Sequence, residues 1–149
     1  RERLTTCDGQ AAFILVHAHD SKHGQAILLT QRDVREAQVG KAAISAGVEL
    51  LLRHLGVSAT QIDRLYLAGA FGNYIRPQSA RRIGLLPDMP LSKVFFVGNA
   101  AADGARLALL DIHRRHNAEE TARRTEYLEL AGKMDFQVLF SDKMFFPEP

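Results

Sequence analysis

The residues of this chain best suited to binding a ligand lie in two glycine-containing turns. Each turn follows a short apolar segment. Leu65–Ala68 is apolar and runs into Gly69–Asn73, which holds two glycines, and Val94–Val97 ends in Gly98 and Asn99. A glycine lets the backbone come close to a ligand, and open α/β sheets bind ligands outside the carboxyl ends of their strands. The pattern predicts two walls of one ligand site. Two tight turns that lead into closely packed helices are the alternative.

Three polar residues share one face of a long predicted helix. Thr30 is placed to cap this helix, with Asp33 at the reciprocal position of a capping box. Gln38, Lys41 and Ser45 follow at offsets of three and four, which puts them on the same face. Such a face either contacts a ligand or is simply solvated, and the spacing leaves both interpretations open.

No arrangement of residues predicts a complete active site. The six histidines form no H-E-x-x-H pair, and no Walker A or G-x-S-x-G sequence is present. His113 and His116 have a spacing that could bind a metal, but Arg114 and Arg115 lie between them, which favours a solvated face. A glycine-lined surface without an acid, base or nucleophile favours a binding half-site over a complete active site.

The composition is that of one globular domain. The chain has 149 residues, 46% of them hydrophobic, and its 19 basic and 17 acidic residues give a small net charge that does not suggest nucleic-acid binding. The single cysteine, Cys7, allows neither an intrachain disulfide nor a cysteine cluster. No apolar run has the length of a membrane span, and no signal peptide is evident, so a cytoplasmic location is the default expectation. The polar start without methionine indicates an excised fragment.

The predicted order of elements is strand, strand, long helix, strand, short helix, strand and further helices. The first ten residues are expected to form a loop or a frayed end. The long helix covers about 31–55 and stops at Gly56, with Gly40 and Gly47 expected at close-packing positions. The four strands are predicted to form one sheet on which this helix packs, the last two as parallel neighbours. The strands are expected at 12–18, 25–29, 65–68 and 93–97, with an edge strand at 127–130, and the other helices at 75–84, 100–116, 118–125 and 134–144.

Several phrases of the sequence, in one order, resemble a known family. The phrases are Thr30–Glu36, Lys41–Ile44, Leu67–Ile75, Ser79–Pro87 and Val97–Ala100. They are similar to the carboxy-terminal domain of the reductive activators of corrinoid proteins. Those are ATP-dependent iron–sulfur proteins of the actin, sugar kinase and Hsp70 superfamily. The resemblance implies an α/β, ribonuclease H-like (actin-like ATPase) lobe, with a mixed sheet and helices on both faces.

The resemblance also implies which residues bind the nucleotide. Gly69–Asn73 matches the adenosine turn of the superfamily, and Gly98 and Asn99 match a second turn beside the adenine, where Hsp70-type members carry an Asp. The helix residues have the spacing of those that hold adenine and ribose in Hsp70-type members. The implied cofactor-binding residues are Gly69, Ala70, Phe71, Gly72, Asn73, Gly98, Asn99, Gln38, Lys41 and Ser45. The resemblance implies no catalytic residue and no metal ligand here.

The expected function is that of the adenosine-side part of an ATPase that lets Co(II) in a corrinoid protein be reduced to Co(I). Residues 1–149 are expected to be a single fragment with a helical appendage from about 117. ATP with magnesium and a 2Fe-2S cluster are implied for the parent protein, because the cysteine-bearing domain, the first lobe and the second phosphate loop are not seen in this sequence. The implied partners are ATP and a corrinoid protein, with a homodimer as one option. The alternatives are a lobe of a small-molecule kinase of the same superfamily and a non-catalytic docking module for a corrinoid protein.

Without a phosphate loop or a magnesium carboxylate, the isolated chain is expected to hydrolyse no ATP above the buffer rate. A phosphate-release assay on the purified chain, with and without magnesium, checks this. Clear magnesium-dependent turnover would contradict the half-site interpretation.

Overall fold

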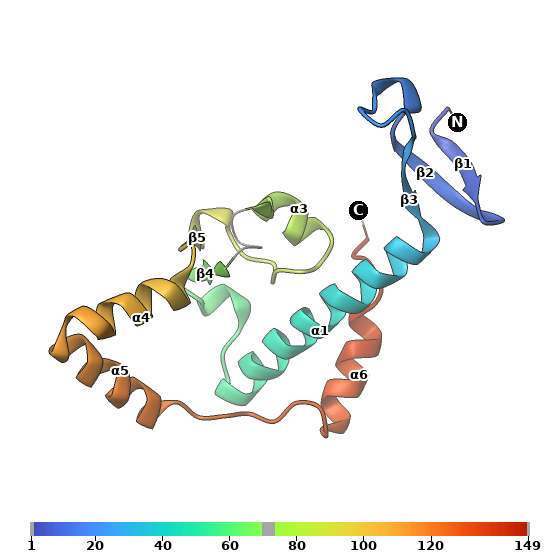
Figure 1. Ribbon diagram of the computed structural model, residues 1–149. Helices are drawn as coiled ribbons and strands as arrows, with labels where there is room; N and C mark the ends of the chain where they lie inside the picture. The colour runs from blue at the N-terminus through green and yellow to red at the C-terminus, as the bar shows by residue number, and fades with distance from the viewer. Residues whose placement is uncertain (1, 70–73, 149) are drawn as a thin grey trace.

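The amino-terminal part of the chain is a three-stranded antiparallel sheet. The computed structural model describes residues 2–69 and 74–148 (Figure 1). Strands β1 (Leu4–Cys7), β2 (Gln10–Val16) and β3 (Ile27–Thr30) lie side by side in that order. A loop or a frayed end was expected for the first ten residues, so β1 is a correction. Its cause is the turn Asp8–Gly9: both residues have positive φ, 51° and 74°, which is the backbone of a two-residue hairpin.

Strand β3 leads directly into the long helix α1 (Gln31–Leu55), whose bounds are those predicted. The capping box is formed: the Thr30 hydroxyl accepts from the Asp33 N–H at 3.2 Å, and the Asp33 carboxylate accepts from the Thr30 N–H at 2.8 Å. The helix ends at Gly56, which has a left-handed φ of 65°. Local capping therefore fixes both ends of this helix.

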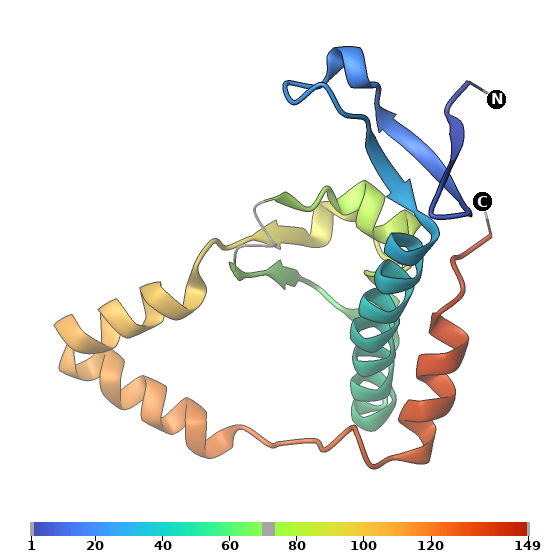
Figure 2. The same cartoon turned by 45° about the vertical axis from the view of Figure 1, so that its right-hand side comes forward.

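Helix α6 (Met134–Lys143) packs along α1 (Figures 1 and 2). The core of this contact consists of Ala46, Leu50 and Leu139, with half-buried apolar residues of α6 and the preceding segment around it. A Cβ at Gly47 would lie 3.4 Å from the Leu130 side chain, so Gly47 is a close-packing position, as predicted. A Cβ at Gly40 would meet no described atom within 4 Å, so that part of the prediction is wrong.

The two later strands form a second sheet. Strands β4 (Leu65–Leu67) and β5 (Val94–Phe96) are parallel, with Leu65 opposite Val94, as predicted. The prediction that all four strands share one sheet is wrong, because the described strands divide into a three-stranded and a two-stranded sheet. The physical reason is α1: its 25 residues carry the chain roughly 37 Å from the end of β3 before β4 can begin.

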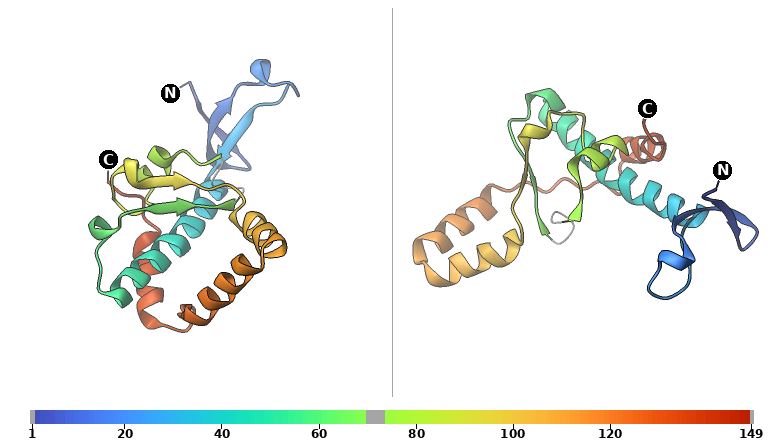
Figure 3. Two further views of the ribbon diagram at one scale, coloured as in Figure 1. Left: turned by 90° about the vertical axis from the view of Figure 1, so that its left-hand side faces the viewer. Right: turned by 90° about the horizontal axis from the view of Figure 1, so that it is seen from above.

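The remaining helices are α3 (Pro77–Arg82), α4 (Ala100–Leu110) and α5 (Ile112–Arg124). The helix expected at 100–116 is broken at Asp111, which has an extended backbone and caps α5 by accepting from the His113 N–H at 2.8 Å. Helices α4 and α5 form a pair that extends away from α1 and α6 (Figures 2 and 3). Residues 127–130 are not a strand, because they form the stretch that returns the chain to α6. Single 3₁₀ turns occur at Ala18–Asp20, Ala59–Gln61 and Leu91–Lys93.

None of the helices in the described ranges combines the length and the apolar character that crossing a membrane requires.

The contact between α1 and α6 predicts where this fold is most sensitive to mutation. Leu139→Ala is expected to lower the free energy of unfolding by about 2–4 kcal/mol, because it removes a buried side chain and leaves a cavity. Val138→Ala is the matched control, since Val138 is the neighbouring residue on α6 and is 55% exposed. Urea unfolding of both variants measures the difference, and equal losses would contradict this packing.

Candidate functional site

Gly69 and Gly98 lie against each other just beyond the carboxyl ends of β4 and β5. The Gly69 N–H donates to the Gly98 carbonyl at 2.7 Å, and the Val97 N–H donates to the Leu67 carbonyl at 3.0 Å. The parallel pairing therefore continues past the strands into the turns. Figure 3 shows the two strands side by side, with their carboxyl ends at the same edge of the sheet. The two strand ends predicted to form one site therefore lie at one edge, while the ligand site itself stays a prediction.

Both glycines are required by the backbone. Gly69 has a φ of 81° and Gly98 a φ of 61°, a region in which a Cβ comes too close to the following carbonyl oxygen. A Cβ built at either position meets no atom of the described residues within 4 Å. The left-handed backbone explains the glycines, and the open space beside them is where a ligand could approach. The left-handed φ accounts for both glycines, and the ligand site stays a prediction.

Asn99 has a structural role next to this edge. Its side-chain oxygen accepts from the Ala102 N–H at 3.2 Å and so caps α4. A carboxamide also carries two N–H donors, which leaves this residue able to donate to an acceptor beside the turn. The predicted residues Ala70, Phe71, Gly72 and Asn73 lie outside the described residues.

The polar face of α1 is not solvated at its centre. Gln38 and Ser45 are half-buried, and Lys41 is only 4% exposed. The Lys41 ammonium donates to the Phe145 carbonyl and lies 5.2 Å from the centroid of the Phe146 ring. Burial, and then the nearby charge of Lys143, lowers the pKa of Lys41. This face is therefore a packed surface against the carboxy-terminal segment.

Two adjoining cavities border this face. The smaller, of about 310 Å³, lies between α1 and the loop at Pro87. The larger, of about 770 Å³, lies between α1, α3 and the carboxy-terminal segment, and Lys41 and Arg81 are among its lining residues. Ser45 and Lys143 line both. Gly69, Gly98 and Asn99 line neither cavity, so the structure brings the glycine turns together and leaves the α1 face as a separate part of the predicted site.

Glu49 forms an ion-pair cluster at the smaller cavity. This cluster was not predicted from the sequence. Its carboxylate lies 2.6 Å from the Lys143 ammonium and also accepts from Arg53, one turn later on α1. The hydrogen bond from Lys143, helped by the one from Arg53, lowers the pKa of Glu49. The spacing of Glu49 and Arg53 signals their pair, whereas Lys143 is brought in by the fold and has no local signal.

Metal ligation has no support in the residues 2–69 and 74–148. These residues contain no group of three or more His, Cys, Asp or Glu side chains arranged to hold a metal ion.

Parallel strands that end at Gly69 and Gly98, together with the long helix α1, make this chain an α/β lobe. A solved structure named "Reductive activator for corrinoid,iron-sulfur protein" is similar to this chain with a TM-score of 0.88 and 36% identity. The similarity covers 98% of this chain and 23% of that one. The family described as "C-terminal domain of RACo the ASKHA domain" matches residues 1–149, and the chain belongs to this family.

Two curated relatives carry related names. "Corrinoid activation enzyme RamQ" of Eubacterium limosum is 39% identical over 129 residues, which are 87% of this chain and 22% of that protein. "[Co(II) methylated amine-specific corrinoid protein] reductase" of Methanosarcina barkeri is 31% identical over 76% of this chain and 21% of that protein. The chain spans about a fifth of the length of these relatives. The expected family and the expected α/β fold class are confirmed, and the single mixed sheet is not.

The Glu49 cluster predicts a loss of stability in acid. A carboxylate with a lowered folded pKa stabilises the fold above its unfolded pKa of about 4.3, and this contribution disappears as the pH falls through the folded value. Glu49→Gln is therefore expected to be less stable than the wild type at pH 6, and the difference is expected to shrink as the pH is lowered into the acid range. Thermal melts across this range test the prediction, with Glu36→Gln on the exposed surface of the same helix as control. A constant difference would contradict it.

Proposed function

We propose that this chain is the adenosine-side part of an ATP-dependent reductive activator of a corrinoid protein. The observation that carries the proposal is the hydrogen bond between Gly69 and Gly98, which holds two strand ends together at one edge of the sheet. No atom of the described residues lies within 4 Å of a Cβ built at either glycine. Ligands of α/β sheets bind at such an edge. The names of the relatives support a corrinoid protein as the partner.

In this proposal the chain binds the nucleoside mainly through backbone. The adenine lies against the two glycine turns, where side chains would interfere, and Asn99 donates to a ring nitrogen from its carboxamide. Gln38, Lys41 and Ser45 supply polar contacts from α1. Lys41 is the cation of this set, which suits it to an oxygen-rich ligand.

The iron–sulfur cluster and the magnesium ion belong, in this proposal, to other parts of the full-length protein. Four thiolates hold such a cluster, and Cys7 is the only cysteine of this chain. The cluster would supply one electron to cobalt, and ATP would supply the free energy for an unfavourable reduction. The residues of this chain bind and orient the nucleotide and leave the phosphate chemistry to the rest of the protein.

The comparisons favour an activator over a small-molecule kinase, because every relative named above is an activator or a reductase of corrinoid proteins. If the chain were instead a docking module that binds a corrinoid protein without nucleotide, Gly69→Val would leave the ATP affinity of the full-length protein unchanged in the following experiment.

Gly69→Val in the full-length protein is expected to weaken ATP binding by about 1–3 kcal/mol, or roughly five- to 150-fold, because the side chain takes space that the nucleoside needs. It is also expected to lower the melting temperature, because valine is strained at the φ of 81°. Isothermal titration with ATP, run beside thermal melts, separates the two effects.

Gly24→Val is the matched control, because Gly24 has a similar φ of 65° and equally open surroundings in the loop before β3. It is expected to lower stability and to leave ATP affinity unchanged. Equal ATP affinity in the wild type and in Gly69→Val would contradict the nucleotide site.

A further inference from the structure

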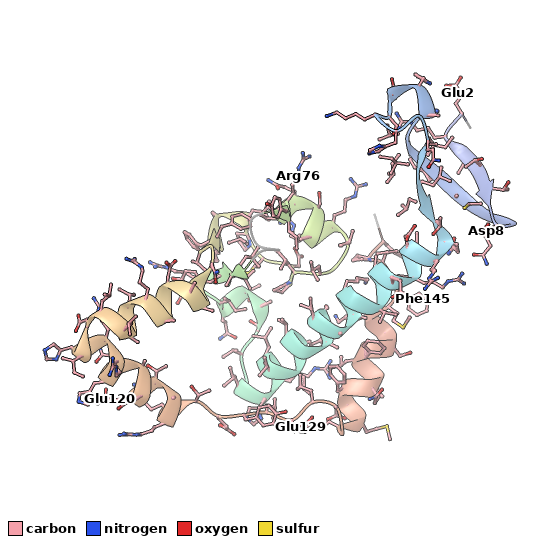
Figure 4. The ribbon with its side chains drawn as sticks, in the orientation of Figure 1. Glu2, Asp8, Arg76, Glu120, Glu129 and Phe145 are labelled. Carbon is pink, nitrogen blue, oxygen red and sulfur yellow. The ribbon has the colours of Figure 1, made fainter. Side chains whose placement is uncertain are left out.

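Lys41 is the one buried charged residue of the described chain, and a segment from the far end of the sequence covers it. The Phe145 carbonyl accepts from its ammonium, and the Phe146 ring lies over it. Figure 4 places Phe145 beside α1, next to the end of α6. We call Met144–Glu148 the strap. The strap is held on α1 by contacts that are centred on a single lysine.

The strap also contacts the end of α3. Gly84 follows α3 with a φ of 76°, and a Cβ there would lie 3.0 Å from the Pro147 ring and 3.5 Å from the Lys41 ammonium. The missing side chain at Gly84 therefore makes room for the strap between α1 and α3. Four residues of the strap, from Phe145 to Glu148, line the larger cavity together with Lys41.

The strap is a weak electrostatic partner for a buried cation. A backbone carbonyl and a ring face are neutral, and none of the ion pairs among the described residues involves Lys41. The carboxylates of the larger cavity, Asp88, Asp142 and Glu148, are accompanied by the cations of Arg81, Arg82 and Lys143. An anionic ligand would make a stronger, charge-assisted hydrogen bond with Lys41 than the carbonyl does.

We propose that the strap is an inhibitory segment: it occupies Lys41 and has to leave before Lys41 can bind the nucleotide. This inference rests on the proposed function, since it concerns the availability of a residue of that site. If the strap is in place most of the time, the apparent affinity for the nucleotide falls by the fraction of molecules in which Lys41 is free. A factor that pulls the strap away would then activate nucleotide binding.

Phe146→Ala tests the inference because it removes the ring over Lys41 and keeps the backbone of the strap. Phe145→Ala is the matched control, since the Phe145 side chain is 75% exposed and only its carbonyl meets Lys41. Phe146→Leu keeps an apolar side chain and removes only the aromatic face. The first readout is the acetylation rate of Lys41 by acetic anhydride, followed by mass spectrometry, with exposed Lys22 and Lys133 as internal references. The second is the Kd for ATP.

Phe146→Ala is expected to speed Lys41 acetylation and to tighten ATP binding by about two- to thirtyfold, the range that corresponds to one lost cation–π contact. Phe146→Leu should change both in the same direction, and Phe145→Ala should change neither. Two results would contradict the claim that the strap covers Lys41. One is acetylation of Lys41 in the wild type as fast as that of Lys22, and the other is an unchanged rate of Lys41 acetylation in Phe146→Ala. Faster acetylation with unchanged or weaker ATP binding would overturn its inhibitory role. If Phe146→Ala speeds Lys41 acetylation but neither the wild type nor any variant binds ATP, the strap covers Lys41 as described and the proposed function is wrong.

Discussion

The packing of α6 on α1 determines where the carboxy-terminal segment of this structure lies. The contact is close because α1 presents Ala42, Ala46 and Gly47, which are buried and have little or no side chain. Leu139 fills the resulting groove from α6. Close packing of small against large residues gives dispersion contacts that neither helix could make alone. Because α6 is fixed in this way, the strap that follows it lies against Lys41.

The glycine turns depend on a different constraint, the parallel pairing of β4 and β5. Parallel strands need a long crossover, and here α3 and the loop after it provide one. The pairing aligns the carboxyl ends of the strands, so Gly69 and Gly98 meet through one backbone hydrogen bond. Both residues have a left-handed φ, and a Cβ at either would meet no atom of the described residues within 4 Å. The proposed nucleoside site is a consequence of this geometry.

Local signals in the sequence predicted the elements that local physics controls. The capping box at Thr30 and the left-handed Gly56 fix the ends of α1, and both could be recognised from residue types alone. The Asp8–Gly9 turn is an equally local signal, and the polar composition around it hid the first strand. Asp111 likewise divides a helix whose apolar pattern continues across it.

Contacts between distant residues could not be predicted in the same way. The hydrogen bond from Lys41 reaches a residue 104 positions later, and no periodicity encodes that pairing. The division of the strands into two sheets is also a matter of tertiary placement. For the site, spacing placed Gln38, Lys41 and Ser45 on one face of α1, but only the fold shows that the strap covers its centre.

Titration of the ¹⁵N-labelled chain with ADP, followed by its amide resonances, tests the central claim most directly. Saturable shifts are expected that are largest at Gly69 and Gly98 and extend to the amides of α1 around Lys41. Shifts confined to β1–β3 or to the α4–α5 pair, or no saturable shift at either glycine, would contradict it.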